Sequence, residues 1–150
     1  FHCEDCSAHH FAETVYQTHQ VIILPPVEFI KEFPDEDVTI HIDRMRLTQV
    51  ITNFLGNAKK FTSQGHIKLG YFCDKEKKEI HIFVEDTGAG IPKEELQMIF
   101  ERFYKRNEFV QGVGLGLAIS KVIVEKMNGH IDVQSEVNKG SRFTAVLPYL

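Results

Sequence analysis

The residues with the clearest chemical potential are an acid and two glycines that follow a strand-like run. The run 80–85 alternates Ile80, Ile82 and Val84 with other residues, which is the period of a β-strand, and it continues into the loop 86–92. Asp86 at the start of this loop could accept a hydrogen bond from an amino group of a flat ligand. Glycines lack Cβ and let the backbone approach such a ligand. A DTGxG sequence alone is more often a turn that binds nothing. This loop is therefore a candidate ligand-binding loop that needs support from elsewhere in the chain.

A second cluster of glycines, 112–117, precedes a predicted helix and is a candidate anion site. Its sequence does not match either of two common phosphate-binding motifs, the P-loop and the dinucleotide-binding pattern. A P-loop needs Gly-Lys followed by Ser or Thr, and no glycine in this chain is followed by lysine. The dinucleotide pattern G-x-G-x-x-G is not matched from Gly112 or from Gly114, and the His-Arg-Asp and Asp-Phe-Gly motifs of eukaryotic-type protein kinases are absent.

A helix predicted from the N-cap Asp43 to about Phe61 carries two faces. One face is apolar and predicts burial: Leu47, Val50, Ile51, Phe54, Leu55 and Ala58. The other face is a ladder of polar side chains, namely Arg46, Gln49, Asn53, Asn57 and Lys60. This ladder is either an ordinary exposed face or a site in which Asn57 offers an oxygen to Mg²⁺ and Lys60 offers charge to a phosphate. Gly56 costs helix stability and suggests the close approach of another element.

Composition predicts one globular domain. The chain has 150 residues, 43% of them hydrophobic, and a net charge of -4, which argues against direct nucleic-acid binding. No apolar run is long enough to span a membrane, so no membrane contact by this domain is expected. Because the chain begins at Phe1 without an initiator Met, we expect an excerpt of a longer protein.

Cys3 and Cys6 have the C-x-x-C spacing, with His9 and His10 close behind. Half of a zinc site or a redox pair is possible, but reduced thiols near a frayed terminus are favoured, because a closed zinc site needs further ligands at a set spacing. The odd number of cysteines also fits a reducing compartment.

The predicted order of elements gives an α/β fold, a two-layer α/β sandwich with helices on one face of a mixed, mostly antiparallel sheet. Ser7 is the expected cap of a first helix to His19, after an extended or irregular segment 1–6. Further helices are expected from Pro92 and over 114–127, the latter with Ala118, Ile119, Val122 and Ile123 inward. The expected strands are 21–24, 27–33 and 38–42, a hairpin of 66–73 with 79–86, and a closing hairpin of 130–136 with 141–147.

Five segments of the chain together resemble the catalytic and ATP-binding domain of bacterial two-component sensor histidine kinases. The run 53–62, NFLGNAKKFT, is similar to their N box, and 86–91, DTGAGI, to their first glycine box. The run 100–104, FERFY, is similar to the F box, 112–118, GVGLGLA, to the second glycine box, and 140–143, GSRF, to a short third one. Each motif alone is weak, but the five occur in the family's order and cover the chain from about Asp43 to its end.

The resemblance implies the Bergerat ATP-binding fold shared with DNA gyrase, and ATP and Mg²⁺ as cofactors. It implies that Asp86 accepts from the adenine amino group with Gly90 behind the base, that Asn57 coordinates Mg²⁺ beside Asn53, and that Lys60 meets phosphate. The implied ATP-binding residues are Asn53, Asn57, Lys60, Asp86, Gly88, Gly90, Ile91, Tyr104, Lys105, Gly112, Gly114, Leu115, Gly116, Leu117 and Ser141. Two residues depart from the usual pattern: Val113 where threonine is frequent, and Asn138 where glycine is frequent.

Asn53 also distinguishes the branches of this fold. In the ATP-hydrolysing branch a glutamate at this position activates water, and an amide lacks the basicity to do so. The resemblance therefore implies transfer of the γ-phosphate to a histidine supplied by another domain. None of the eight histidines is followed by Asp or Glu, as the family's acceptor is, so no catalytic residue is assigned within this chain.

The expected partners are the dimerisation and histidine-phosphotransfer domain of the parent kinase and the receiver domain of a response regulator. The expected location is the cytoplasm, as part of a membrane sensor kinase, and the isolated domain should be inactive without its acceptor. Two alternatives remain open: a nucleotide-gated interaction module without transfer, and a serine kinase of the anti-sigma factor type.

Overall fold

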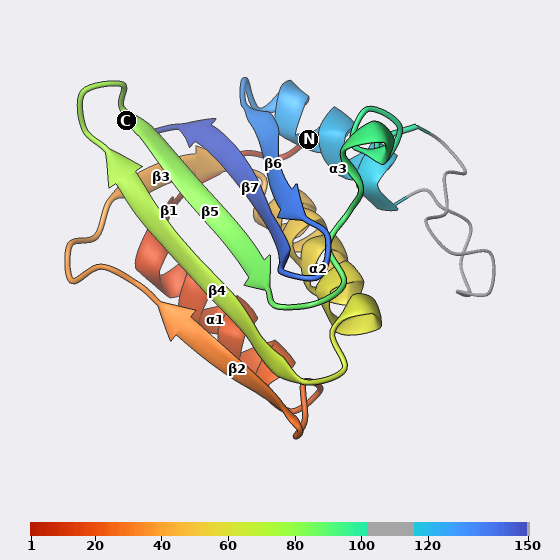
Figure 1. Cartoon of the computed structure of the whole chain (residues 1–150). Helices are drawn as coiled ribbons and strands as arrows, with labels where there is room; N and C mark the ends of the chain where they lie inside the picture. The colour runs from red at the N-terminus through yellow and green to blue at the C-terminus, as the bar shows by residue number, and fades with distance from the viewer. Residues whose placement is uncertain (102–115, 150) are drawn as a thin grey trace.

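A computed structural model describes residues 1–101 and 116–149 of the chain (Figure 1). Its largest unit is a five-stranded sheet in the order β2-β4-β5-β7-β6. The strands are β2 (Val27–Glu32), β4 (Gly65–Asp74), β5 (Glu79–Asp86), β6 (His130–Glu136) and β7 (Gly140–Pro148). Only β2 and β4 pair in parallel, and the other three pairs are antiparallel, which confirms the predicted mixed, mostly antiparallel sheet.

In the described ranges, three α-helices cover one face of this sheet: α1 (Ala8–Gln20), α2 (Arg44–Phe61) and α3 (Gly116–Lys126) (Figure 1). Among the described residues this arrangement is the predicted two-layer α/β sandwich. Alternate residues of β4, β5 and β7 point to the helices and are buried, as the period of a strand requires. The six predicted apolar residues of α2, from Leu47 to Ala58, are all buried against them.

The predicted caps of the first two helices are confirmed. Ser7 Oγ accepts from the backbone N–H of His10 at 3.0 Å, and Asp43 Oδ1 accepts from that of Arg46 at 3.1 Å. Each side chain satisfies a backbone donor that the first turn of a helix leaves free. These two local bonds place the beginnings of α1 and α2 where the sequence expects them.

One prediction for the first third of the chain is wrong, and another was incomplete. Residues 21–24 form a turn rather than a strand: the N–H groups of Ile22 and Ile23 both donate to the carbonyl of His19, so the segment continues from α1 and pairs with none of the described strands. The segment 1–6, expected to be extended or irregular, is extended over its second half, where it forms most of β1 (Glu4–Ser7); this strand pairs with β3 (Thr39–Ile42) in a separate two-stranded sheet that the sequence did not predict.

The expected helix from Pro92 is also wrong within the described residues. A short 3-10 helix, η1 (Lys93–Glu95), is followed by turns up to Phe100. The N–H groups of Glu95 and Leu96 donate to carbonyls three residues back, which is the 3-10 pattern rather than the α-helical one. The apolar face expected for this helix comprises Leu96, Ile99, Phe100 and Phe103. Ile99 is buried, Leu96 and Phe100 are partly buried against the core, and Phe103 lies outside the described residues.

The inward face of α3 differs from the prediction. Ile119 and Val122 are 39% and 52% exposed, and Ala118 is half-buried, whereas Ser120, Ile123 and Val124 are buried. The helix is rotated so that the hydroxyl of Ser120 faces α2, where it has a polar partner. The part of the predicted helix before Gly116 lies outside the described residues.

Candidate functional site

Asp86, the acid that the sequence predicts at the centre of the site, ends β5 and is 8% exposed. It lies opposite Ile67 of β4 and Ser141 of β7, so neighbouring strands hold it on both sides. Its carboxylate accepts from the backbone N–H of Gly88 at 2.9 Å. Burial raises the pKa of Asp86, and the backbone N–H groups of Gly88 and Ser141 partly oppose this rise. The strand end therefore presents a fixed carboxyl group.

The glycines of the loop 86–92 pack against the protein's own backbone. A Cβ on Gly88 would overlap the Phe61 carbonyl oxygen at the end of α2, and the neighbouring Ala89 N–H donates to the same oxygen at 3.2 Å. Gly90 has a φ of 72°, and a Cβ there would overlap the carbonyl oxygen of Glu136. The loop is thus held between the end of α2 and the hairpin of β6 and β7, which gives its glycines a packing role beside the predicted one.

Asn53 connects the polar ladder of α2 to the first turn of α3. Its Nδ2 donates to the carbonyl oxygen of Gly116 and to Ser120 Oγ, both at 3.1 Å. Ser120 Oγ also donates to the Gly116 carbonyl at 2.8 Å. Close packing accompanies these bonds, because a Cβ on Gly116 would lie 3.5 Å from the Asn53 side chain. The ladder of α2 therefore contacts the described end of the second glycine cluster, at Gly116.

Asn57 and Lys60 follow Asn53 by one and about two turns of α2, in the direction of the loop that contacts Phe61. Asn57 is half-buried and Lys60 is exposed. The suggestion that Gly56 marks the close approach of another element is wrong for the described residues, since no atom of another described element lies within 4 Å of a Cβ built there. One face of α2 thus runs from the start of α3 to the loop of Asp86.

The remaining predicted site residues divide into two groups. Gly88, Gly90, Ile91, Gly116, Leu117 and Ser141 are described and belong to the loop 86–92, the first turn of α3 and the start of β7. The others lie outside the described residues: Tyr104, Lys105, Gly112, Gly114 and Leu115.

Ser135 near the end of β6 is a residue of this region that the sequence analysis did not identify. Its Oγ accepts from the Ile91 N–H at 2.7 Å and lies 2.8 Å from Ser141 Oγ and 3.0 Å from the Gly140 carbonyl oxygen. The predicted closing hairpin was the available signal, and the register that the structure gives it places Ser135 directly opposite Ser141. Ser135 connects the loop 86–92 to both strands of the closing hairpin.

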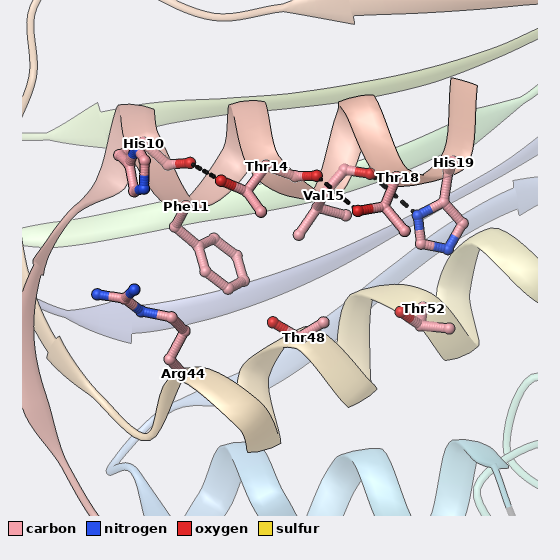
Figure 2. Close-up of a pocket in the computed structure, with 9 residues that line it drawn as sticks. All are labelled: His10, Phe11, Thr14, Val15, Thr18, His19, Arg44, Thr48 and Thr52. Atoms are coloured by element: carbon pink, nitrogen blue, oxygen red, sulfur yellow. Dashed lines mark hydrogen bonds between the residues drawn. The ribbon is translucent and has the colours of Figure 1, made fainter. Parts of the chain in front are cut away.

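A separate groove of 140 Å³ lies between α1 and α2 (Figure 2). Arg44, Thr48 and Thr52 of α2 face side chains of α1 that include Phe11 and Thr14. The groove contains none of the predicted ATP-binding residues. It is therefore distinct from the site around Asp86.

The structure also shows the state of the three cysteines and which side chains could bind a metal. All three are free thiols, so Cys3 and Cys6 form no disulfide. The one cluster of three potential metal-ligating side chains found in the ranges 1–101 and 116–149 is Asp74, Glu79 and His81, beside the turn between β4 and β5. It includes neither cysteine. In the same ranges, no helix has the length and apolar character needed to cross a membrane.

Comparison with known families and sequences gives consistent matches. Residues 42–150 match the family model described as histidine kinase-, DNA gyrase B- and HSP90-like ATPase. The sensor histidine kinase WalK of Bacillus subtilis is 39% identical over 128 residues, covering 82% of this chain and 21% of WalK. The sensor protein SrrB of Staphylococcus aureus is 44% identical over 110 residues, covering 71% of this chain and 19% of SrrB. The chain therefore spans about a fifth of the length of these curated relatives.

Comparison with solved structures agrees with the sequence matches. Full-length ShkA in complex with AMPPNP superposes with a TM-score of 0.89 and 28% identity, covering 98% of this chain and 31% of ShkA. The catalytic domain of the histidine kinase ThkA superposes with a TM-score of 0.86 and 28% identity, covering 99% of this chain and 97% of that domain. The fold predicted from the sequence and the family resemblance are both confirmed.

Proposed function

Because the chain belongs to the family of histidine kinase-, DNA gyrase B- and HSP90-like ATPases, as the catalytic domain of a sensor histidine kinase, we propose that it binds Mg-ATP and passes the γ-phosphate to a histidine. The acceptor is a histidine on the dimerisation domain of the parent kinase. The γ-phosphoryl group moves from the β-phosphate oxygen to an imidazole nitrogen, and ADP leaves. The 150 residues form a single catalytic domain in this proposal, and the phosphate continues to the receiver domain of a response regulator.

The observation that carries the proposal is Asp86. It is a buried acceptor fixed at the end of β5, beside a loop whose backbone is packed on both sides. A carboxylate in such a position is suited to bind the exocyclic amino group of adenine. Gly88, Gly90 and Ile91 would then lie against the base, and Ser141 beside Asp86 would complete its polar edge.

The polar face of α2 supplies the residues assigned to metal and phosphate. Mg²⁺ takes oxygen ligands and shares them with phosphates, and the half-buried amide of Asn57 can offer such an oxygen. When bound, the ion would neutralise charge on the phosphate oxygens. Lys60 is assigned to phosphate, together with the backbone of Gly112, Gly114, Leu115, Gly116 and Leu117, while Tyr104 and Lys105 are assigned to the ribose and phosphates.

Transfer is favoured over hydrolysis by the residue at position 53. The hydrogen bonds of Asn53 to Gly116 and Ser120 both use its Nδ2, and an amide does not take a proton from water at neutral pH. Phosphoryl transfer to an acceptor on another domain requires chiefly positioning and electrostatic stabilisation from this domain. The absence of a base at position 53 is compatible with that role.

The partially exposed apolar side chains of α3 support docking of a partner. Ile119 and Val122 are 39% and 52% exposed on the helix that begins at the Asn53 contact. We assign this face to the helical dimerisation domain, whose acceptor histidine must reach the phosphates. Since the phosphoryl donor is ATP, we assign the domain to the cytoplasmic part of its parent.

Calorimetric titration with a non-hydrolysable ATP analogue, with and without Mg²⁺ and against the GTP analogue, tests binding. We expect selective binding of the ATP analogue that Mg²⁺ strengthens. Addition of the parent's helical hairpin in trans, with labelled ATP, tests transfer, and the label is expected on histidine. Nucleotide-dependent association without label would support the interaction module, label on serine would support the serine kinase, and no binding of nucleotide would contradict the proposal.

A further inference from the structure

Three polar residues lie in a row across neighbouring strands at one end of the sheet. Ser135 of β6 is opposite Ser141 of β7, and Ser141 is opposite Asp86 of β5. Directly opposed residues of antiparallel strands point to the same face of a sheet. All three side chains therefore face the helical layer, on the side to which the proposed base pocket belongs.

The hydrogen bonds of Ser135 determine the direction of the hydrogen bond between the two serines. Its hydroxyl has one proton to donate and two lone pairs to accept with. The Gly140 carbonyl, 3.0 Å away, can only accept, so this bond uses the proton of Ser135. The Ile91 N–H, 2.7 Å away, can only donate and occupies one lone pair. The bond between the serine hydroxyls, 2.8 Å long, must therefore use the proton of Ser141.

This assignment leaves Ser141 with lone pairs only. Its single proton points to Ser135, away from Asp86, and its oxygen can accept but no longer donate. The pocket edge formed by Ser141 and the Asp86 carboxylate then consists of acceptors. Such an edge favours a base with an amino group at that position, as in adenine, over one with a carbonyl oxygen, as in guanine.

We propose that Ser135 is a positioning residue of the nucleotide pocket, which holds the Ile91 backbone in place and turns the Ser141 hydroxyl so that the pocket selects adenine over guanine. The proposal rests on the proposed function for its nucleotide part. Its structural part, the attachment of Ile91, is independent of any ligand. The two parts can therefore be measured separately on the 150-residue chain.

Amide hydrogen exchange followed by NMR tests the attachment. In Ser135→Ala the Ile91 N–H loses its acceptor, and we expect its exchange to accelerate about tenfold or more. Ser135→Thr keeps a hydroxyl and should retain slow exchange. Gln134→Ala is the matched control, since it changes an exposed neighbour on the opposite face of β6. Unchanged Ile91 exchange in Ser135→Ala would overturn the proposal.

Titration with ATP and GTP analogues tests selectivity. We expect Ser135→Ala to reduce the preference for the ATP analogue about threefold to tenfold, as the freed Ser141 hydroxyl can donate to a carbonyl oxygen. Ser135→Thr should restore the preference. If Ser135→Ala prefers the ATP analogue as strongly as the unsubstituted chain does, the selectivity role is overturned, even if the Ile91 amide hydrogen exchanges faster.

Two other results can be distinguished from a failure of the Ser135 proposal: the chain binds no nucleotide, or Ser135→Ala does not fold. If the 150-residue chain without substitutions binds no nucleotide, the proposed function and the selectivity role both fail. The exchange rate of the Ile91 N–H still decides whether Ser135 holds the Ile91 backbone. If circular dichroism shows that Ser135→Ala does not fold, Ser135→Cys replaces it, because a thiol of similar size is a weaker acceptor. Parental exchange and selectivity in Ser135→Cys would overturn the proposal.

Discussion

The side-chain amide of Asn53 donates a 3.1 Å hydrogen bond to the carbonyl oxygen of Gly116, 63 residues further along the chain. This bond joins the polar face of α2 to the first turn of α3, at the last glycine of the second glycine cluster. Asn53, which the family resemblance assigns to a place beside Mg²⁺, thus also holds two helices together. Changes at position 53 should therefore affect stability as well as nucleotide binding.

We expect Asn53→Ala to lower the free energy of unfolding by about 1–2 kcal/mol, because the bonds to Gly116 and Ser120 are lost together. Urea denaturation followed by circular dichroism measures the change. Lys59→Ala, at an exposed position of the same helix, is the control and should stay within about 0.5 kcal/mol of the parent. Equal stability of Asn53→Ala and the parent would show that the bond does not hold α3.

Asp86 should make the free protein less stable as the pH rises. Burial raises its pKa from an ordinary value of 3.8, so the folded state binds the proton more tightly than the unfolded chain. Below the pKa that Asp86 has in the unfolded chain, its carboxyl group is protonated in both the folded and the unfolded state, and the fold loses no stability. As the pH rises through the folded pKa, the buried carboxylate must ionise and the fold loses stability.

The substitution Asp86→Asn should therefore increase the free energy of unfolding at neutral pH, with a gain that disappears below about pH 3.8. The same variant should bind the ATP analogue about tenfold or more weakly, since the charged acceptor is lost. Urea denaturation across this pH range and calorimetry measure the two effects. Asp35→Asn, at an exposed position, should show neither. A gain that persists undiminished at low pH would contradict this assignment.

Asn57→Ala should mainly remove the effect of Mg²⁺ on nucleotide binding. The ratio of the dissociation constants measured without and with Mg²⁺ should fall toward one, while binding without Mg²⁺ changes little. Asp86→Ala provides the contrast, because it should abolish adenine recognition in both conditions. Full enhancement by Mg²⁺ in Asn57→Ala would exclude Asn57 as the ligand of the ion.

Two glycines should respond to alanine in opposite ways. Gly90→Ala should destabilise the fold by at least about 1 kcal/mol, because its φ of 72° is left-handed and a Cβ would overlap the Glu136 carbonyl. Gly56→Ala should stabilise it by about 0.5–1 kcal/mol, since the position is inside α2 and no atom of another described element lies within 4 Å of a Cβ there. Thermal unfolding of both variants checks the signs. The same sign for both would contradict this account.

Elements specified by local signals could be predicted from the sequence. Ser7 and Asp43 begin α1 and α2 because a side-chain oxygen caps a backbone N–H three residues away. The two antiparallel hairpins follow from alternating runs that are joined by short turns. The place of Asp86 at the end of a strand follows from the same alternation, so the centre of the candidate site was accessible without a structure.

Other features depend on which distant segment is available as a partner. The apolar residues 21–24 resemble a strand but pair with no strand in the part of the chain that the structure describes, whereas the less strand-like segment Glu4–Ser7 pairs with β3. Likewise, apolar spacing alone put Ile119 and Val122 inward on α3, and the hydrogen bond from Asn53 to Ser120 places a hydroxyl there instead.

The sequence by itself determined the caps, the hairpins, the polar face of α2 and the acid at the end of β5, because each depends on residues a few positions apart. Only the tertiary structure decided which backbone groups the loop 86–92 packs against, and that Ser135 holds Ile91 beside Ser141. Ile91 and Ser135 are 44 residues apart in the sequence. A hydrogen bond depends on separation in space, so contacts of this kind become visible only when the sheet has brought its strands together.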